Sequence, residues 1–184
     1  MAIKNKDQRV AVFFDIQNLY HSAKNLYQAR VNFNEVLKTA VAGRKLIRAI
    51  AYVVKSETAE GEASFFGVLE KIGIELRMKD LQIYPGGLKK ADWDVGIAVD
   101  AIRLSDSLDA IVLITGDGDF LPLVEYLKTH GKQVEVIGFS RSASSKIKEA
   151  ADEFFDLESQ PEKFLIQSTA SAKRGFIKKR IKIK

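Results

Sequence analysis

Cysteine is absent from the 184-residue sequence, and this absence excludes disulfide bonds, thiolate zinc sites and cysteine nucleophiles. A long apolar run is also lacking, since no stretch approaches the roughly 20 apolar residues that a transmembrane helix needs. The first residues, Met1 to Arg9, are polar and charged, unlike a signal peptide. These absences favour a cytoplasmic protein with no membrane partner.

Histidine is scarce as well, with two residues in the whole chain. His21 falls within an expected helix, and His130 falls at the end of another helix, beside Gly131. Histidines in such places are more often structural than catalytic, so we assign a role to neither.

Positive charge is concentrated at the C-terminus. The formal net charge is +5, yet seven lysines and arginines fall in the last dozen residues, with no acid after Glu162. The rest of the chain is therefore slightly acidic. A basic terminal segment either binds polyanions or is simply solvated chain, and the sequence leaves both interpretations open. We expect a folded domain over residues 1–158 and a flexible basic tail over residues 159–184.

Short apolar runs alternate with helical patterns along most of the chain. Runs typical of strands occupy residues 9–14, 45–54, 74–78, 111–114 and 133–139, with an edge strand expected at 154–157. Apolar residues spaced three and four apart predict helices at 17–28, 32–42, 60–72, 92–104, 121–130 and 144–151. This alternation predicts an α/β class protein with three α/β/α layers around a doubly wound, mainly parallel sheet of five or six strands. The expected strand order, numbered along the chain, is 3-2-1-4-5.

The stretch from Ile111 to Phe120 places two carboxylates in a turn directly after a buried strand. Asp117 and Asp119 lie two residues apart, between glycines that permit a tight bend of the backbone. Carboxylates packed together repel one another and lose solvation, and a divalent cation would offset both costs. We therefore interpret the turn as half of a metal site.

Two further acids are expected at the same edge of the sheet. Asp15 follows the first strand, and Asp94 lies in the first turn of the helix that leads into the fourth strand. Ligands of open parallel sheets bind at the carboxyl ends of the strands, where the strand order reverses. Four carboxylates around one cleft suit Mg²⁺ or Mn²⁺, which prefer oxygen ligands. Asn18 would hold a water or a phosphate oxygen, and Thr115 would bond a metal ligand or the scissile phosphate.

Each of these acids also has a structural alternative. Asp15 and Asp119 would cap the helices that follow them, and Asp94 would interact favourably with a helix N-terminus. Asp92 is expected to be the N-cap of the helix that carries Asp94. Asp117 has the fewest structural alternatives, because it lies between two glycines after a buried strand.

Three motifs occur in a fixed order along the chain. They are Phe13-Phe14-Asp15-Ile16-Gln17-Asn18, then Lys90-Ala91-Asp92-Trp93-Asp94 and the helix up to Asp100, then Thr115-Gly116-Asp117-Gly118-Asp119-Phe120. Together they resemble the NYN domain, and more narrowly its LabA/DUF88 branch within the PIN-like nuclease superfamily. A closing segment from Gly138 to Phe154 is similar to the last strand and helix of that branch. The resemblance covers residues 9–158.

The resemblance implies a PIN-like α/β/α fold and metal-dependent cleavage of RNA phosphodiester bonds. Thr115 stands where many members have serine, which keeps the hydroxyl. We therefore expect a ribonuclease, acting as an endonuclease, with Mg²⁺ or Mn²⁺ as cofactor and RNA as partner. The positions that the resemblance makes catalytic are Asp15, Asn18, Asp94, Asp117 and Asp119, of which the four aspartates are also the expected metal ligands.

Cations are needed to recruit RNA, because the acids repel its phosphates. Four are expected near the mouth of the cleft, and three in the tail would add salt-sensitive contacts. With Thr115, the residues assigned to substrate binding are Lys89, Lys90, Arg141, Lys146, Lys178, Lys179 and Arg180.

Other functions stay open at this point. A non-catalytic RNA-binding or regulatory module of the LabA type would keep the same fold. A haloacid-type phosphatase is disfavoured, because Gln17 stands where the general acid of that class would be. A homodimer is compatible with the sequence, which does not fix the oligomeric state.

Overall fold

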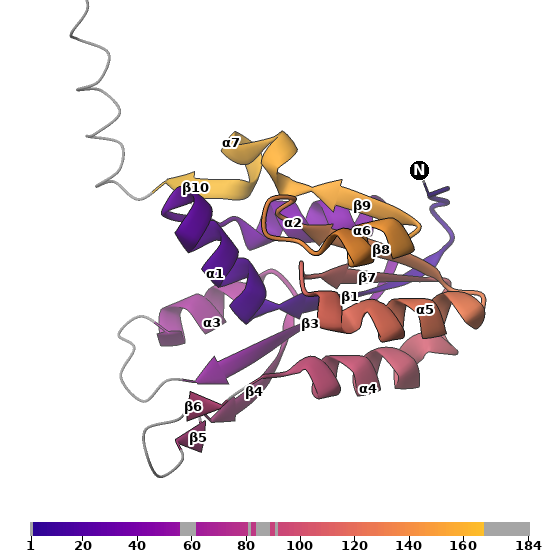
Figure 1. The fold of residues 1–184 in the computed structure, drawn as a ribbon, viewed down its shortest axis with the longest axis horizontal. Helices are drawn as coiled ribbons and strands as arrows, with labels where there is room; N and C mark the ends of the chain where they lie inside the picture. The colour runs from indigo at the N-terminus through magenta and orange to yellow at the C-terminus, as the bar shows by residue number, and fades with distance from the viewer. Residues whose placement is uncertain (1, 56–61, 81, 84–88, 91, 168–184) are drawn as a thin grey trace, which may run out of the picture.

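Parallel strands form the centre of the computed structural model, which describes residues 2–55, 62–80, 82–83, 89–90 and 92–167. The six-stranded central sheet has the order β4-β3-β1-β7-β8-β9, and every adjacent pair is parallel (Figure 1). The predicted fold class and strand order are confirmed, with β9 as the additional edge strand. The strands are β1 (Arg9–Asp15), β3 (Lys45–Lys55), β4 (Glu75–Asp80), β7 (Ala110–Ile114), β8 (Gln133–Gly138) and β9 (Glu153–Asp156).

The strand order reverses between β1 and β7, which are neighbours in the middle of the sheet. Phe14 pairs with Ile114, so Asp15 and Thr115 lie side by side where the two strands end. Both strands are buried along their apolar residues, as a parallel sheet covered on both faces requires. The reversal thus brings the first and third sequence motifs together.

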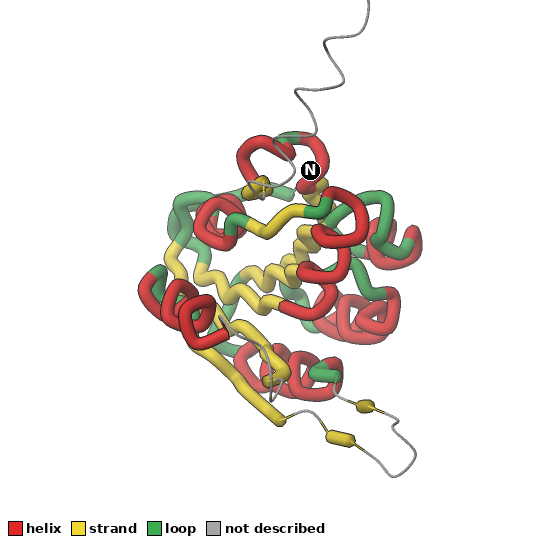
Figure 2. The backbone as a smooth tube through the Cα atoms, turned by 90° about the vertical axis from the view of Figure 1, so that its left-hand side faces the viewer, coloured by secondary structure: helices red, strands yellow, loops and turns green. Residues whose placement is uncertain are grey.

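Helices cover both faces of the sheet, and Figure 2 shows the strands between them. Val10, Val12 and Phe14 of β1 belong to one apolar core, whereas Ala11 and Phe13 belong to a second core on the opposite face. Within the described residues, no helix has the length and apolar character needed to cross a bilayer. The first core is covered by α1 (Ile16–Tyr27), α2 (Phe33–Val41) and α3 (Glu62–Lys71), and the second by α4 (Asp94–Ser105), α5 (Leu121–Thr129) and α6 (Ser145–Ala150).

A small hairpin lies between β4 and α4 along the chain. Its strands are β5 (Gln82–Ile83) and β6 (Lys89–Lys90), which pair antiparallel and form a sheet of their own. Lys89 and Lys90 supply the backbone of β6.

Regular structure continues beyond residue 158. A 3-10 turn at Leu157–Ser159 leads into α7 (Pro161–Phe164) and β10 (Leu165–Gln167), and β10 pairs antiparallel with β2 (Ala29–Val31). Phe164 is fully buried and packs edge-on against Phe155. The expected tail boundary is therefore wrong for residues 159–167, because such short elements carry too little periodicity to be predicted. Residues 168–184, which include Lys178, Lys179 and Arg180, lie outside the described residues.

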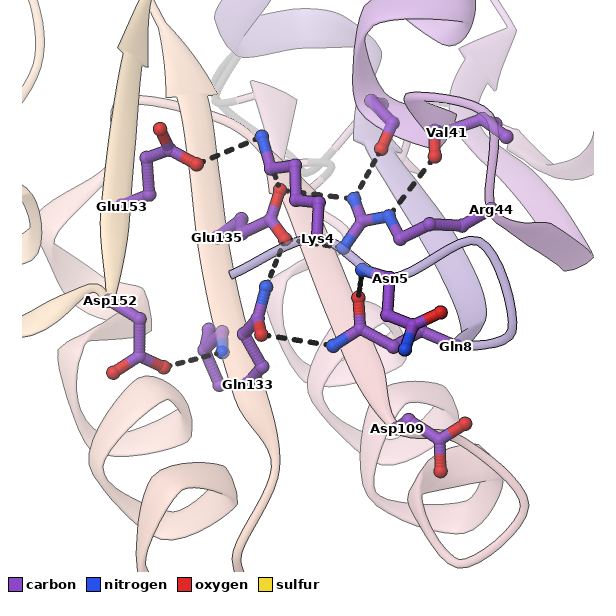
Figure 3. A network of polar contacts seen from close by, with 12 residues as sticks. Lys4, Asn5, Gln8, Val41, Arg44, Asp109, Gln133, Glu135, Asp152 and Glu153 are labelled. Atoms are coloured by element: carbon purple, nitrogen blue, oxygen red, sulfur yellow. Dashed lines mark hydrogen bonds and ion pairs between the residues drawn. The ribbon is translucent and has the colours of Figure 1, made fainter. Parts of the chain in front are cut away.

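A polar network at the amino ends of the strands holds the N-terminal segment (Figure 3). Arg44 and Glu135 form a buried ion pair with two short contacts, Nη1 to Oε1 at 2.5 Å and Nη2 to Oε2 at 3.1 Å. Lys4 reaches Glu135 at 3.3 Å and Glu153 at 2.8 Å. These residues lie at the opposite ends of the strands from Asp15, so the network stabilises the fold and takes no part in the site.

Candidate metal-binding site

Three carboxylates meet near the point where the strand order reverses. Asp94 is the first residue of α4, Asp117 follows β7, and Asp119 lies in the 3-10 turn Gly118–Phe120. One carboxylate oxygen from each lies within 4.8 Å of the others. In the part of the chain that the structure describes, no lysine or arginine forms an ion pair with any of the three. Their negative charge is therefore not balanced by a described protein cation.

Asp15 lies beside this group without belonging to it. Its Oδ1 accepts a hydrogen bond from the backbone N–H of Asn18 at 3.1 Å, which caps α1, and its Oδ2 accepts one from the Thr115 hydroxyl at 3.0 Å. Burial raises the pKa of Asp15, and the two hydrogen bonds oppose that rise. The structure thus gives Asp15 its capping role and also places it in the wall of the acidic cavity.

Asn18 and Thr115 connect the two loops that carry the acids. The Asn18 Oδ1 accepts a hydrogen bond from the Gly116 N–H at 2.8 Å, and the Thr115 Oγ1 accepts one from the Asp117 N–H at 3.1 Å. Thr115 is 2% exposed, so its hydroxyl serves the Asp15 carboxylate and does not face a ligand. Thr115 was expected to bond either an acidic metal ligand or the scissile phosphate, and in the structure it bonds an acid, Asp15.

Helix capping was the predicted alternative role of Asp119, but in the structure Asp117 makes the capping bond. The Asp117 Oδ1 accepts a hydrogen bond from the Asp119 N–H at 2.9 Å and caps the 3-10 turn. Asp119 does not cap α5, which begins at Leu121 without a side-chain cap. The predicted N-cap role of Asp92 is also wrong, because Trp93 occupies that position. Asp119 is exposed, so its carboxylate is free to turn toward a ligand.

Close packing, and not a bend of the backbone, accounts for the glycines on either side of Asp117. Neither Gly116 nor Gly118 has a positive φ angle. A Cβ at Gly116 would lie 3.0 Å from the Ala143 Cα, and a Cβ at Gly118 would lie 2.8 Å from the Ser144 Oγ. The acidic turn is therefore pressed against the loop before α6, which fixes the position of Asp117.

The carboxyl group of Asp94 has a pKa well above its ordinary value. Burial, followed by the negative charges of Asp15 and Asp117, raises the pKa of Asp94 to about 6. The raised pKa reflects the same excess of negative charge that a bound cation would relieve.

The donor set fits a hard divalent cation such as Mg²⁺ or Mn²⁺. Asp94, Asp117 and Asp119 offer carboxylate oxygens from three separate backbone positions, close enough to share one ion. Three carboxylate ligands leave room for water or a phosphate oxygen, as Mg²⁺ sites usually require.

A cavity of about 450 Å³ opens beside the acids and runs along α1. Apart from Asn18, none of its α1 residues was assigned a role, and His21 was set aside. A signal for them was present in the sequence, because polar residues recur at intervals of three and four directly after Asp15. The cavity is lined by Asp15, Asp92, Asp94 and Asp117, by Gln17, Asn18, His21, Ser22, Asn25 and Leu26 of α1, and by Ser142.

Arg141 and Lys146 are the cations assigned to substrate binding whose side chains the structure describes. Arg141 precedes Ser142 at the cavity wall, but its Nε bonds the Glu158 Oε2 at 2.6 Å, and its guanidinium lies 5.0 Å from the centre of the Tyr27 ring. Lys146 is exposed in the first turn of α6. Of these two cations, Arg141 is the one that the structure places next to the cavity.

Comparison with known proteins gives one family and several relatives. The model of the NYN domain matches residues 9–158. The low amplitude and bright protein LabA of Synechococcus elongatus is 22% identical over 161 residues, covering 83% of this chain and 85% of LabA. An uncharacterized protein of Methanocaldococcus jannaschii is 39% identical over 67 residues, covering 35% of this chain and 28% of that protein. The crystal structure of a Vibrio parahaemolyticus protein of unknown function superposes with a TM-score of 0.80 at 30% identity, covering 90% of this chain and 100% of that chain.

Proposed function

This chain belongs to the NYN domain family, and we propose that it is a divalent-metal-dependent ribonuclease that hydrolyses phosphodiester bonds within an RNA strand. The observation that carries the proposal is the meeting of Asp94, Asp117 and Asp119 within 4.8 Å at the strand-order reversal. The family supports a nuclease-like or RNA-related role. The unbalanced acid cluster adds the chemical reason for metal-assisted hydrolysis.

Asp94, Asp117 and Asp119 would hold one Mg²⁺ or Mn²⁺ ion. When bound, such an ion polarises a phosphoryl oxygen and stabilises the charge that develops during hydrolysis. Asp117 is fixed by its own capping bond, whereas the exposed Asp119 can adjust to the ligand.

Asp15 would orient the attacking water. A carboxylate has about four lone-pair positions, and the bonds from Asn18 and Thr115 occupy two of them. The remaining positions can accept a hydrogen bond from a water in the cavity that Asp15 lines. Asn18 supports this role indirectly, since it holds the helix that begins after Asp15 against Gly116.

Cations at the edge of the site would offset the repulsion between these acids and RNA. Arg141 lies nearest to the cavity, and Lys146 stands at the start of α6. Lys89, Lys90 and the tail residues Lys178, Lys179 and Arg180 are proposed as further phosphate contacts, and such contacts weaken as salt concentration rises.

A cleavage assay tests the proposal. Purified protein is incubated with end-labelled RNA and Mn²⁺, and Asp117→Asn is compared with Asp106→Asn, which removes an exposed acid at the C-terminal end of α4. We expect internal cleavage by the wild type and by Asp106→Asn, and its loss in Asp117→Asn. Equal cleavage by all three would identify a contaminating nuclease and contradict the proposal.

A non-catalytic RNA-binding module is the second candidate. One observation favours it: Asp15 and Asp117 both cap helical turns, so their presence does not by itself require catalysis. Absence of cleavage by the wild type, with RNA still bound, would support this alternative.

A further inference from the structure

We propose that the polar face of α1 is the wall along which a single RNA strand lies, and that it distinguishes RNA from DNA through the ribose 2′-hydroxyls. The inference rests on the proposed function for the position of the scissile phosphate, at the acidic end of the cavity. Beyond that function, the inference gives the path of the RNA strand along α1 and the reason why ribose is preferred to deoxyribose.

The cavity follows one face of α1 away from the acids. Gln17, His21 and Asn25 are spaced four residues apart, so they lie in a row, with Asn18 and Ser22 beside them. From Gln17 to Asn25 the helix advances about 12 Å at 1.5 Å per residue. That length matches about three or four nucleotides stacked at 3.4 Å.

The side chains of this wall are polar and form hydrogen bonds. Amide, imidazole and hydroxyl groups line it, and no lysine or arginine is among the described residues of the cavity. Such groups both donate and accept hydrogen bonds, as the 2′-hydroxyl and the edges of unpaired bases do. A wall built to hold phosphates would instead carry cations. The lining therefore favours sugars and bases of a single strand over the backbone of a duplex.

The two sides of the cavity are held in fixed positions. Leu19 and Ala23 bury the opposite face of α1 in the core, and the Ser142 hydroxyl bonds the Ser22 hydroxyl at 2.9 Å across the cavity wall. Arg141, adjacent to Ser142, is held by Glu158, and its guanidinium lies over the Tyr27 ring. A strand along α1 would thus have the acids at one end and a positioned cation toward the other.

Binding of matched oligonucleotides tests the inference. The probes are two fluorescent single strands of the same sequence, one RNA and one 2′-deoxy, titrated by anisotropy with Ca²⁺ in place of Mg²⁺ to limit cleavage. The variant is His21→Ala combined with Asn25→Ala, both exposed positions on the cavity. The control is Lys24→Ala on the same helix, whose ammonium group contacts Tyr20 outside the cavity.

We expect the wild type and Lys24→Ala to bind RNA more tightly than DNA. The double variant should lose about tenfold in RNA affinity, as for one or two lost hydrogen bonds, and less in DNA affinity, because DNA has no 2′-hydroxyl contacts to lose. An unchanged ratio of RNA to DNA affinity in the double variant would overturn the inference, and so would equal affinities in the wild type. Lack of cleavage would contradict the ribonuclease proposal alone, because these titrations measure binding without it. Circular dichroism of the variants verifies that both are folded.

Discussion

The Thr115 hydroxyl donates a 3.0 Å hydrogen bond to the Asp15 Oδ2, joining residues one hundred positions apart in the chain. The bond is possible because β1 and β7 are neighbours at the strand-order reversal. It links the first and third motifs and, with the bond from Asn18 to Gly116, sets the separation of the acidic loops.

Loss of that hydroxyl should weaken both the fold and the site. In Thr115→Val the buried Asp15 carboxylate loses a hydrogen bond that lowers its pKa, so the pKa of Asp15 should rise further. We expect the free energy of unfolding to fall by about 2 kcal/mol, as for a hydrogen bond to a charged group. Urea denaturation at pH 7 measures the loss. Thr115→Ser is the control and should retain most of the stability, because it keeps the hydroxyl. A loss in Thr115→Val no larger than the loss in Thr115→Ser would contradict the special contribution of the hydroxyl.

The stability of the metal-free protein should depend on the ionisation of Asp94. Its pKa is about 6 in the folded protein against an ordinary value of 3.8. Between these values the folded state binds more protons at this site than the unfolded chain, so the contribution of Asp94 to stability falls as pH rises. Relative to wild type, Asp94→Asn should therefore become progressively more stable from about pH 4 to pH 7. Urea denaturation in EDTA across this range is the measurement, and a constant difference between the two proteins would contradict the expectation.

Divalent cations should stabilise the folded protein. A ligand that binds only the native state at 100 times its dissociation constant adds about 2.7 kcal/mol. Mn²⁺ should raise the melting temperature of the wild type and of Asp106→Asn, and have little effect on Asp94→Asn or Asp117→Asn. The same rise in all four proteins would locate Mn²⁺ binding elsewhere.

The buried Arg44–Glu135 pair should affect stability without affecting the site. Arg44→Met removes the bidentate partner of the buried Glu135 carboxylate and leaves Lys4 as its ion-pair partner, so it should cost up to about 3–5 kcal/mol. The double variant Arg44→Met with Glu135→Leu should recover much of that loss. The exposed Arg9–Asp109 pair is the matched comparison, and Arg9→Met should destabilise the fold far less than Arg44→Met. Chemical denaturation measures all three, and a double variant no more stable than the single one would show that the pair itself is stabilising.

Deletion of residues 173–184 should weaken RNA binding and reduce its dependence on salt. The deleted segment carries seven positive charges, and each phosphate contact adds to the slope of affinity against salt concentration. Anisotropy titrations between about 50 and 200 mM salt test this, because phosphate contacts weaken steeply over that range. An identical slope in the full chain and the deletion would show that these charges do not contact RNA.

The architecture was predictable because its signals are periodic and local. The apolar runs at residues 9–14 and 111–114 could only be buried strands, and strand order followed from the helices between them. The resemblance to the NYN domain and its LabA branch is likewise confirmed, by a match over residues 9–158 and by LabA itself. The first and third motifs each follow a predicted strand, so neighbouring positions of those strands in the sheet were enough to predict that the motifs meet.

What the sequence did not predict depends on contacts between distant segments. Gly116 packs closely against Ala143 and Gly118 against Ser144, and no local pattern relates either glycine to its neighbour. Asp117, and not Asp119, makes a capping bond because a 3-10 turn at Gly118–Phe120 precedes α5 and Asp117 is the N-cap of that turn. Phe164 is buried in a helix of four residues, too short for any periodicity.

The pairing of β10 with β2 fixes where the C-terminal segment leaves the fold. Gln167 pairs with Ala29, two residues beyond the end of α1. An RNA strand bound along α1 would already be attached to the molecule that carries the basic residues after Gln167. The rate at which the RNA and these basic residues meet would then depend on the effective concentration set by the attachment at β10, and not on the bulk concentration of RNA. For the tail contacts proposed above, the pairing of β10 with β2 would turn a separate binding event into an intramolecular one.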